Sequence, residues 1–275
     1  MKRKKTSKVI IYLIMILISI IMIFPFYWMI VTSFQPLKAV YKYPPEFIPS
    51  EPTFNNYKVI FGKYNFLRYT INSLFVATTA AFGQLFTCSL AGFAFARMKF
   101  VGKEIFFGLL LATMMVPIEV VIIPEFLLMN ALGWIDTYLP LIVPSFLVGS
   151  TGTFLMRSFY ENVPRELEEA AVIDGAGPFR VYWNVFLPLS RSSLSALFII
   201  SFLINWNAML RPLIYLNDQK KFTLPLALIS FMGEYSAQWN YLLAGAVVSV
   251  LPIFVVYVIM QRQFIEGITS TGLKG

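Results

Sequence analysis

Histidine is absent from this chain of 275 residues, and cysteine occurs only once, as Cys88. Without histidine the chain lacks the side chain that most often acts as a general base near neutral pH and most often binds a transition metal. A single cysteine excludes a disulfide within the chain. The nucleotide-binding string G-x-x-x-x-G-K-[ST] does not occur either. We therefore expect no enzyme activity, no catalytic or metal-binding residues, and no ATPase site in this chain.

Charged residues are also scarce, at 13%, whereas hydrophobic residues make up 58% and the mean hydropathy is +0.71. A soluble domain of this length could not cover so much apolar surface, but lipid accepts it. The composition predicts an all-α integral membrane protein with one transmembrane domain, residues 1–275. The net charge of +8 does not indicate a nucleic-acid partner, because the basic residues cluster at the ends of apolar runs.

Six apolar segments are long enough to cross a membrane, over roughly residues 9–30, 72–97, 105–129, 139–159, 192–213 and 241–260. The first follows the basic start Met1-Lys2-Arg3-Lys4-Lys5 and lacks the short core and small-residue cleavage site of a signal peptide, so we interpret it as an uncleaved span. In the second, small residues recur every fourth position at Ser73, Ala77 and Ala81, which favours close helix packing. Polar loops are expected outside, at about 34–70, 130–138 and 214–240.

The distribution of positive charge predicts the orientation of these spans. With both termini in the cytoplasm, 14 of the 22 lysines and arginines lie on the cytoplasmic side, including Arg180 and Lys274. Cytoplasmic loops of membrane proteins carry such an excess. We therefore expect a multi-pass protein of a bacterial cell membrane, with the loop at residues 160–190 and the tail after Met260 in the cytoplasm.

The loop at residues 160–190 is both charged and patterned like helix. Three acidic residues follow Pro164 and suit the positive end of a helix, namely Glu166, Glu168 and Glu169. Three apolar residues share one face of that helix, namely Leu167, Ala170 and Ala171. Asp174-Gly175 predicts its end, and Gly177-Pro178 predicts a second helix that Pro188 closes. Four aromatic residues would share a face of the second helix, namely Phe179, Tyr182, Trp183 and Phe186.

This loop resembles the EAA loop of ATP-binding-cassette importer permeases. The match consists of Glu169-Ala170-Ala171, then Asp174-Gly175-Ala176 after two residues, and then Leu187-Pro188. Each short string is common by itself, but their spacing inside a polar loop between two apolar segments is specific. In that family the loop is a coupling helix that sits in a cleft of a separate ATPase subunit. The resemblance implies this role for these eight residues. ATP and magnesium would bind to the ATPase partner, and this chain would bind no cofactor.

Further strings are similar to the smaller permease of carbohydrate (maltose-type) importers. They are Trp206-Asn207, Pro212-Leu213, Thr223-Leu224-Pro225, Leu243-Ala244-Gly245-Ala246, Leu251-Pro252 and Gln261-Arg262-Gln263-Phe264. The resemblance covers essentially the whole chain and implies import of a sugar or oligosaccharide. It implies as partners a second homologous permease, two ATPase subunits, an extracellular or periplasmic solute-binding protein, and membrane lipid. The chain departs from the pattern at Ala208 and Arg211, where an acidic residue and an aromatic are expected.

Four polar residues inside the predicted spans are candidates to line a substrate path, namely Gln84, Glu119, Asn205 and Asn207. Polar side chains are costly in lipid, so they usually face protein or water. Glu119 can equally be a carboxylate that reaches the membrane surface. Asn205 and Asn207 flank Trp206, and an interfacial aromatic belt explains that tryptophan equally well.

Other functions leave parts of this sequence unexplained. Gly149-Ser150-Thr151-Gly152 superficially resembles an intramembrane serine-protease string, but no histidine is present to act as its base. A secondary transporter would have inverted repeats, which the sequence does not show. Two alternatives remain open: a permease for another solute class, such as polyamine, phosphate or peptide, and a membrane scaffold without a transport function.

Overall fold

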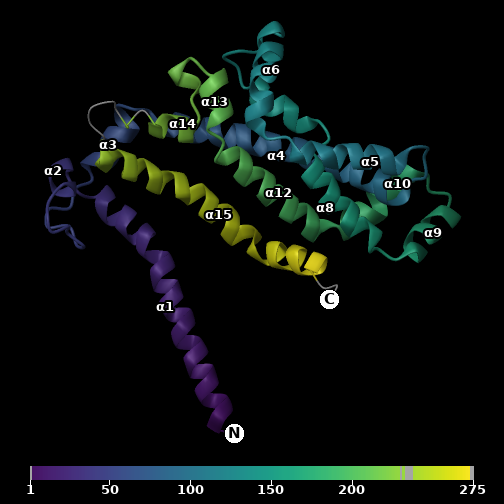
Figure 1. The fold of residues 1–275 in the computed structure, drawn as a ribbon, viewed down its shortest axis with the longest axis horizontal. Helices are drawn as coiled ribbons and strands as arrows, with labels where there is room; N and C mark the ends of the chain where they lie inside the picture. Colours follow the sequence, from purple (N-terminus) through teal and green to yellow (C-terminus); the bar gives the residue numbers. More distant parts are fainter. Residues whose placement is uncertain (1, 230, 233–237, 273–275) are drawn as a thin grey trace. The chain divides into compact units, whose positions relative to one another are not determined.

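The computed structural model describes residues 2–229, 231–232 and 238–272. Residues 273–275, the end of the predicted cytoplasmic tail, lie outside this range, as do six residues of the predicted loop 214–240. The regular secondary structure of the described residues is helical, with no strand among them (Figure 1). The chain forms two compact units, Met1–Arg68 with Ala227–Pro252 and Tyr69–Leu226 with Ile253–Gly275.

The first unit contains α1 (Lys2–Ser33), α2 (Leu37–Val40), α3 (Asn55–Gly62) and parts of α4 (Phe66–Arg97), α14 (Leu224–Ile229) and α15 (Trp239–Gly272). Within Ile10–Ser33 of α1, the most apolar 18-residue window has a mean hydropathy of 2.7 and contains no buried residue, as expected of a helix surrounded by lipid or partner chains. The end of α1 differs, because Val31, Thr32 and Ser33 are buried. The loop that follows α1 is fixed by the buried Asn56, whose amide donates to the carbonyl oxygens of Ser33 and Gln35, both at 2.8 Å. Asn240 donates in turn to the Asn56 side-chain oxygen.

The second unit contains most of α4 and the helices that surround it. They are α5 (Lys103–Ala112), η1 (Thr113–Met115), α6 (Ile118–Ala131), α7 (Leu139–Ile142), η2 (Val143–Phe146), α8 (Ser150–Glu161), α9 (Arg165–Ile173), α10 (Pro178–Val181), the π-helix η3 (Tyr182–Phe186), α11 (Leu187–Leu189), α12 (Arg191–Trp206), α13 (Leu210–Tyr215) and η4 (Gln219–Lys221). The predicted small-residue face of α4 is confirmed, because Ser73, Ala77 and Ala81 are all buried.

Four described stretches are long and apolar enough to cross a membrane: Ile10–Ser33, Phe66–Arg97, Leu139–Glu161 and Trp239–Gln261. Two further spans are possible if each of two bent helix pairs counts as one. The predicted third span, residues 105–129, is not one straight helix, because the chain bends by 101° between Lys103–Met115 and Ile118–Ala131. Pro117 causes this break, since it lacks an N–H group and forces Val116 into an extended conformation, at ψ 113°.

The predicted fifth span, residues 192–213, is also interrupted. α12 ends at Trp206, and α13 begins only at Leu210. Trp206 is buried against Phe202, with ring centroids 5.5 Å apart, so it is not part of an interfacial aromatic belt. The physical reason is that this face of α12 packs against protein, and sequence alone does not show which face of an apolar helix meets lipid.

The core of the second unit lies where α4, α8 and η3 meet. It comprises Cys88, Phe93, Met156, Tyr160, Val163, Val181, Tyr182, Phe186 and Leu197. α4 and α8 approach closely at Gly92, where an added Cβ would lie 2.6 Å from the Met156 Cβ atom. A glycine is therefore required there, and the close contact joins α8, and the loop after it, firmly to α4.

Candidate functional site

The predicted first helix of the 160–190 loop is present as α9. Pro164 precedes it in an extended conformation, and Glu166 and Glu168 lie in its first turn, where the helix dipole favours negative charge. The helix ends as predicted at Asp174-Gly175. Gly175 has a φ of +80°, its N–H donates to the Val172 carbonyl, and the Ala176 N–H donates to the Ala171 carbonyl, both at 2.9 Å.

These two bonds form a Schellman cap, in which a left-handed glycine lets the chain satisfy the last carbonyls of a helix. The motif requires a glycine four residues after Ala171, and it places Ala176 back over Ala171. Both alanines pack against the core of the second unit. The spacing of Ala171, Gly175 and Ala176 in the sequence is therefore explained by the cap alone, independently of any partner.

The eight residues of the EAA resemblance divide into two sets in the structure. Three pack against the core, namely Ala171, Ala176 and Leu187. Five are exposed, namely Glu169, Ala170, Asp174, Gly175 and Pro188. The predicted apolar stripe is only partly right, because Leu167 and Ala170 point away from the core while Ala171 faces it. α9 thus presents an open face that carries Glu169, Ala170 and Ile173, the last 85% exposed.

The aromatic residues of the second predicted helix do not share one face. Tyr182 and Phe186 are buried, whereas Phe179 and Trp183 are 66% and 52% exposed. The reason is the π-helix η3, which has more residues per turn than an α-helix and so shifts the phase of the side chains. The helical stretch also continues past Pro188 to Leu189 before the chain bends into α12.

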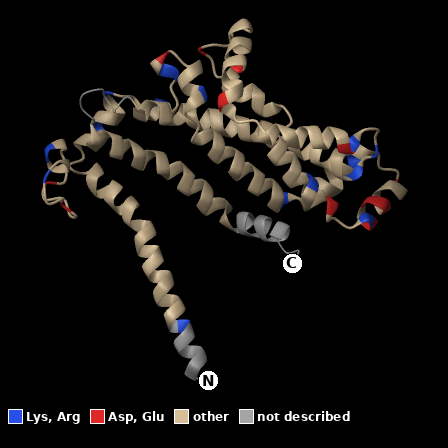
Figure 2. Cartoon of the chain, viewed as in Figure 1, with Lys and Arg blue, Asp and Glu red and all other residues tan. Residues whose placement is uncertain are grey.

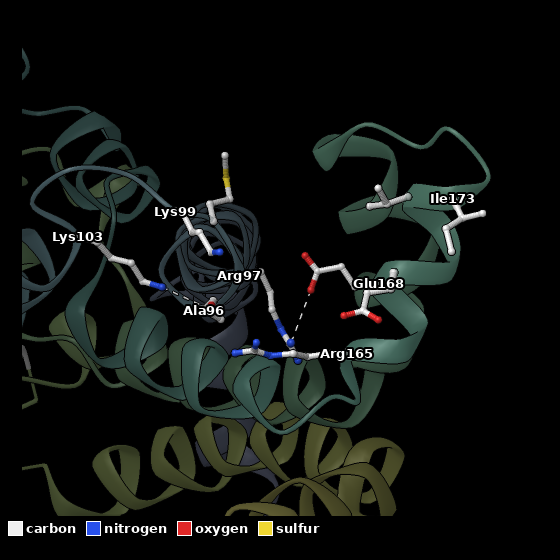
Figure 3. A pocket seen from close by; sticks show the side chains of 10 residues that line it. Ala96, Arg97, Lys99, Lys103, Arg165, Glu168 and Ile173 are labelled. Atoms are coloured by element: carbon white, nitrogen blue, oxygen red, sulfur yellow. Dashed lines mark hydrogen bonds and ion pairs between the residues drawn. The ribbon is translucent and has the colours of Figure 1, made fainter.

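Arg97, at the end of α4, holds the start of this loop in place. Its side chain is 6% exposed, and its guanidinium donates to the carbonyl oxygens of Tyr160 (Nε at 3.0 Å) and Val163. Figure 3 shows the same side chain reaching across a cleft towards Glu168 of α9, and the Nη1 to Oε2 distance is 3.6 Å. The guanidinium also lies 5.1 Å from the Phe186 ring centroid. One residue therefore fixes the end of α8, α9 and η3 relative to α4.

A buried hydroxyl cluster adds a second connection between the same elements. The Tyr182 hydroxyl donates to Ser89 Oγ at 3.0 Å, and the Tyr160 hydroxyl lies 2.7 Å from that oxygen. Ser190 Oγ is 3.4 Å from the Tyr160 hydroxyl. Because these groups lie among apolar side chains, each would be costly if left unpaired, so the cluster favours one arrangement of η3 on α4.

The other end of the second unit is joined by ion pairs. Asp136, between α6 and α7, accepts from Lys221 at 2.7 Å and from the backbone N–H groups of Asn217 and Asp218. These donors lower the pKa of Asp136 to about 2. Glu125 of α6 pairs with Arg211 of α13 at 3.1 Å. Figure 2 shows charged residues gathered around α9 and again around α6 and α13, with the middle of α12 free of them.

The four candidates for a substrate path occupy different surroundings. Gln84 accepts from the Ser201 hydroxyl at 2.6 Å, and the Asn205 amide donates to the Ser201 carbonyl at 2.8 Å. Asn205 also lines a cavity of about 210 Å³ together with Arg211 and mostly apolar residues of α4, α6, α7 and α13. Glu119 is exposed in the first turn of α6, and Asn207 is exposed at the end of α12. The structure thus brings Gln84 and Asn205 together through Ser201, but not Glu119 and Asn207.

Sequence reasoning missed Arg97 and the pair of Glu125 with Arg211 as structural determinants. An arginine that ends an apolar helix is usually counted only as a topology marker, so its position gave no sign of a buried clamp. Arg211 was conspicuous as a departure from the family pattern. Its partner lies 86 residues away, on a helix whose bend the sequence did not predict.

Residues 88–268 match the family described as "Binding-protein-dependent transport system inner membrane component". The chain is 35% identical over 279 aligned positions to the sn-glycerol-3-phosphate transport system permease protein UgpE of Brucella abortus strain 2308, covering 98% of this chain and 99% of that protein. It is 33% identical to the arabinooligosaccharides transport system permease protein AraQ of Halalkalibacterium halodurans, covering 99% and 100%.

A solved structure shares the fold. It is described as the crystal structure of a bacterial ABC transporter involved in the import of the acidic polysaccharide alginate, and it superposes with a TM-score of 0.83 over 96% of this chain and 98% of the other, at 21% identity. The family match and the full-length relatives show that this chain belongs to the family of binding-protein-dependent transport system inner membrane components, and is an importer permease of a bacterial cell membrane.

Proposed function

We propose that this chain is the smaller permease subunit of an ATP-driven importer for a sugar or oligosaccharide. In this proposal it pairs with a second permease, takes its solute from a binding protein outside the cell, and is driven by two ATPase subunits that carry ATP and magnesium. Six spans with both termini in the cytoplasm put α9 on the side of the ATPases, in agreement with the excess of basic residues expected there. Full-length similarity to permeases named for arabino-oligosaccharides and glycerol phosphate supports a polyhydroxylated solute.

The observation that carries the proposal is the construction of α9. Its inner face is fixed to α4 by Arg97 and by the packing of Ala171 and Ala176, while its outer face leaves Ala170 and Ile173 uncovered. A helix that is held rigidly on one side and exposes apolar groups on the other is suited to transmit a push from a partner. The small side chain of Ala170 would let the ATPase cleft approach the helix closely.

A substrate path alongside Gln84 and Asn205 is the second part of the proposal. Both side chains are tied to Ser201 and so are held in place, and Asn205 borders a cavity with room for a small solute group. Amide groups that are positioned beforehand can bind sugar hydroxyls at a low entropic cost. Glu119 and Asn207 remain weaker candidates, because each is exposed on its own helix end.

The test uses the chain produced with its partner permease, ATPase and binding protein. Ala170→Arg should leave the amount of inserted permease unchanged but remove the ATPase from the purified complex, because the bulk would block docking. Ala131→Arg, at an exposed alanine of α6, is the matched control and should change neither. Ala171→Arg is a poorer choice, because Ala171 packs against the core and the substitution would also disturb the fold.

The same complex tests the path. Asn205→Leu should raise the solute concentration needed for uptake more than Asn207→Leu does, because Asn207 is exposed at the end of its helix. ATP hydrolysis stimulated by sugars, polyamines, phosphate or peptides identifies the solute class. Normal ATPase retention in Ala170→Arg would contradict the coupling role, and stimulation by a polyamine or peptide alone would replace the sugar assignment.

A further inference from the structure

We propose that the second unit binds an anionic phospholipid in the cleft between the end of α4 and α9. The headgroup would occupy the basic part of the cleft, and one acyl chain would lie in the apolar groove that continues from it. This inference concerns a lipid site distinct from the solute path, and it does not depend on which solute is carried.

The cleft has a volume of about 570 Å³, and four of its lining side chains are cationic. Arg97, Lys99 and Lys103 come from the end of α4 and the start of α5, and Arg165 comes from the start of α9 (Figure 3). Two carboxylates, Glu168 and Glu169, line it as well, so the cations exceed the carboxylates by two. Glu168 is engaged with Arg97. Lys103 donates to the Ala96 carbonyl at 3.4 Å, which is a neutral partner, so Glu169 is the one further lining carboxylate that can balance the charges of Lys99, Lys103 and Arg165. A phosphodiester group matches this excess of charge.

The groove beyond the cleft is apolar. A second hollow of about 330 Å³ shares Arg97, Met98, Lys99, Glu168 and Val172 with the cleft and extends to Phe93 and Pro178. A third, of about 320 Å³, shares Phe93, Met98 and Pro178 with the second. Its remaining lining consists of Leu90, Ala94, Phe179 and Tyr182. The three hollows therefore form one continuous surface that is basic at one end and apolar at the other.

The exposed aromatic rings beside the groove indicate its depth in the membrane. Phe179 and Trp183 stack with centroids 6.2 Å apart, and both are more than half exposed. Exposed tryptophan and other aromatic rings of membrane proteins concentrate at headgroup level. Lys99 lies just beyond the last turn of α4, where a long cationic side chain reaches the same level. In this proposal the basic cleft lies at the height of lipid phosphates, and the apolar groove runs along α4 towards the hydrocarbon region.

A phospholipid fits this surface better than an acidic protein segment or a free phosphate ion does. An acidic loop or an inorganic phosphate would satisfy the basic end but would leave the partly exposed Leu90 and Ala94 uncovered. A neutral lipid would fill the groove but leave the cations unpaired. Only an amphiphile with an anionic headgroup matches both parts.

The experiment measures binding of fluorescent phosphatidylglycerol to the purified complex in detergent, with phosphatidylcholine as the neutral probe. Each basic residue near a membrane surface strengthens binding to anionic lipid by about fivefold. The double variant Lys99→Gln and Arg165→Gln should therefore weaken phosphatidylglycerol binding by roughly 30-fold. Its matched control is Lys58→Gln with Lys220→Gln, which removes the same charge from exposed positions elsewhere and should leave binding unchanged. Ala94→Trp should also weaken binding by filling the groove without a charge change, whereas Ala112→Trp, on an exposed face of α5, should not.

Three results would overturn the proposal. One is equal affinity of the unmodified complex for phosphatidylglycerol and phosphatidylcholine. Another is displacement of phosphatidylglycerol by millimolar inorganic phosphate, which would mean that the cleft recognises only an ion. The last is unchanged lipid binding in the Lys99 and Arg165 variant together with loss of the ATPase subunits from the complex, which would assign the basic cluster to a protein interface. A failure of the solute assignment would leave all three measurements unaffected.

Discussion

The two ends of the second unit are held together by different kinds of interaction. Around α9, a nearly buried arginine donates to backbone carbonyls, and aromatic rings and hydroxyl groups pack tightly beneath it. Around α13, the contacts are carboxylate–cation pairs, Asp136 with Lys221 and Glu125 with Arg211, whose side chains are between 14% and 38% exposed. Backbone carbonyls do not titrate, and salt affects the hydrogen bonds to them little. Dissolved salt screens partly exposed ion pairs, which therefore contribute less to the free energy of unfolding.

We therefore expect the α9 end to move as one body and the α13 end to separate at a lower cost in free energy. In the proposed function, force enters at the α9 end and the protein opens at the other, and the two kinds of interaction suit these two tasks. Four substitutions test this difference, from the largest expected effect to the smallest.

Arg97→Ala should give the largest effect. It leaves the Tyr160 and Val163 carbonyls without their charged donor, and a buried acceptor that loses its partner costs about 1–3 kcal/mol. We expect the free energy of unfolding in detergent to fall by about 3 kcal/mol. Arg97→Lys keeps the charge but not the forked geometry and should recover only part of this loss. A change below about 0.5 kcal/mol would mean that Arg97 is not a clamp.

Glu125→Ala should have an intermediate effect. It leaves Arg211, on α13, with an uncompensated charge beside a mostly apolar cavity, at a cost of about 1–3 kcal/mol. Replacing both members, as Glu125→Gln with Arg211→Gln, should restore much of the stability, because no unpaired charge remains. Added salt should also weaken the contact between α6 and α13 in the unmodified protein, because it screens the pair of Glu125 and Arg211. A double variant as unstable as Glu125→Ala would contradict the pairing.

Gly175→Val should cost about 1–2 kcal/mol, because a β-branched residue at a φ of +80° is strained even though no neighbour lies within 4 Å of its Cβ position. Gly177 is the matched control: it is also open, but its φ of −71° suits any residue. Gly177→Val should therefore be nearly neutral, and Gly175→Asn should be milder than Gly175→Val. Circular dichroism melting of the three variants makes the comparison. Equal melting of the two valine variants would show that the cap does not require glycine.

The smallest effect concerns the response of the α13 end to acid. Asp136 has a pKa of about 2 in the fold, below its ordinary value of 3.8, so its contribution is fully present above about pH 4 and is lost as the pH falls towards 2. Hydrogen-exchange protection of the segment around Asn217 and Asp218 should decline over this range, while protection of α9 should not. Asp136→Asn should show low protection at every pH. If the difference in hydrogen-exchange protection between the unmodified protein and Asp136→Asn did not change with pH, Asp136 would not be the titrating group.

The sequence predicted some of these features well. The end of α9 at Asp174-Gly175 followed from local chemistry, since a glycine in a left-handed conformation is a property of a few neighbouring residues. The burial of Ser73, Ala77 and Ala81 followed from their spacing on one helix. The assignment of residues 160–190 to a family depended on strings of the same local kind.

Other features could not be predicted because they depend on contacts between distant segments. Arg97 is a clamp only because α8 ends beside it, 63 residues later in the chain. Whether Tyr182 and Trp183 face the core or the surface depends on the π-helix η3, and the hydrophobic periodicity of the sequence does not predict the extra residue in its turn. Pro117 was visible in the sequence, but a proline inside an apolar run can either kink a helix slightly or reverse its direction. The roles of Gln84, Glu119, Asn205 and Asn207 stay predictions, because a path is defined by all the chains that line it.

The break between η1 and α6 also bears on how a cell has to produce this protein. Met114, Met115 and Val116 are all at least half exposed there, on non-helical or tightly wound backbone. Hydrocarbon cannot satisfy freed peptide groups, so irregular backbone persists in membranes only where protein or water covers it. A pulse-chase comparison should therefore show a shorter half-life for the chain made alone than for the chain made with its partners, and equal half-lives would contradict this. Synthesis of the chain has to be matched in time and amount by synthesis of the subunit that covers the break, and surplus copies are expected to be removed by membrane proteases.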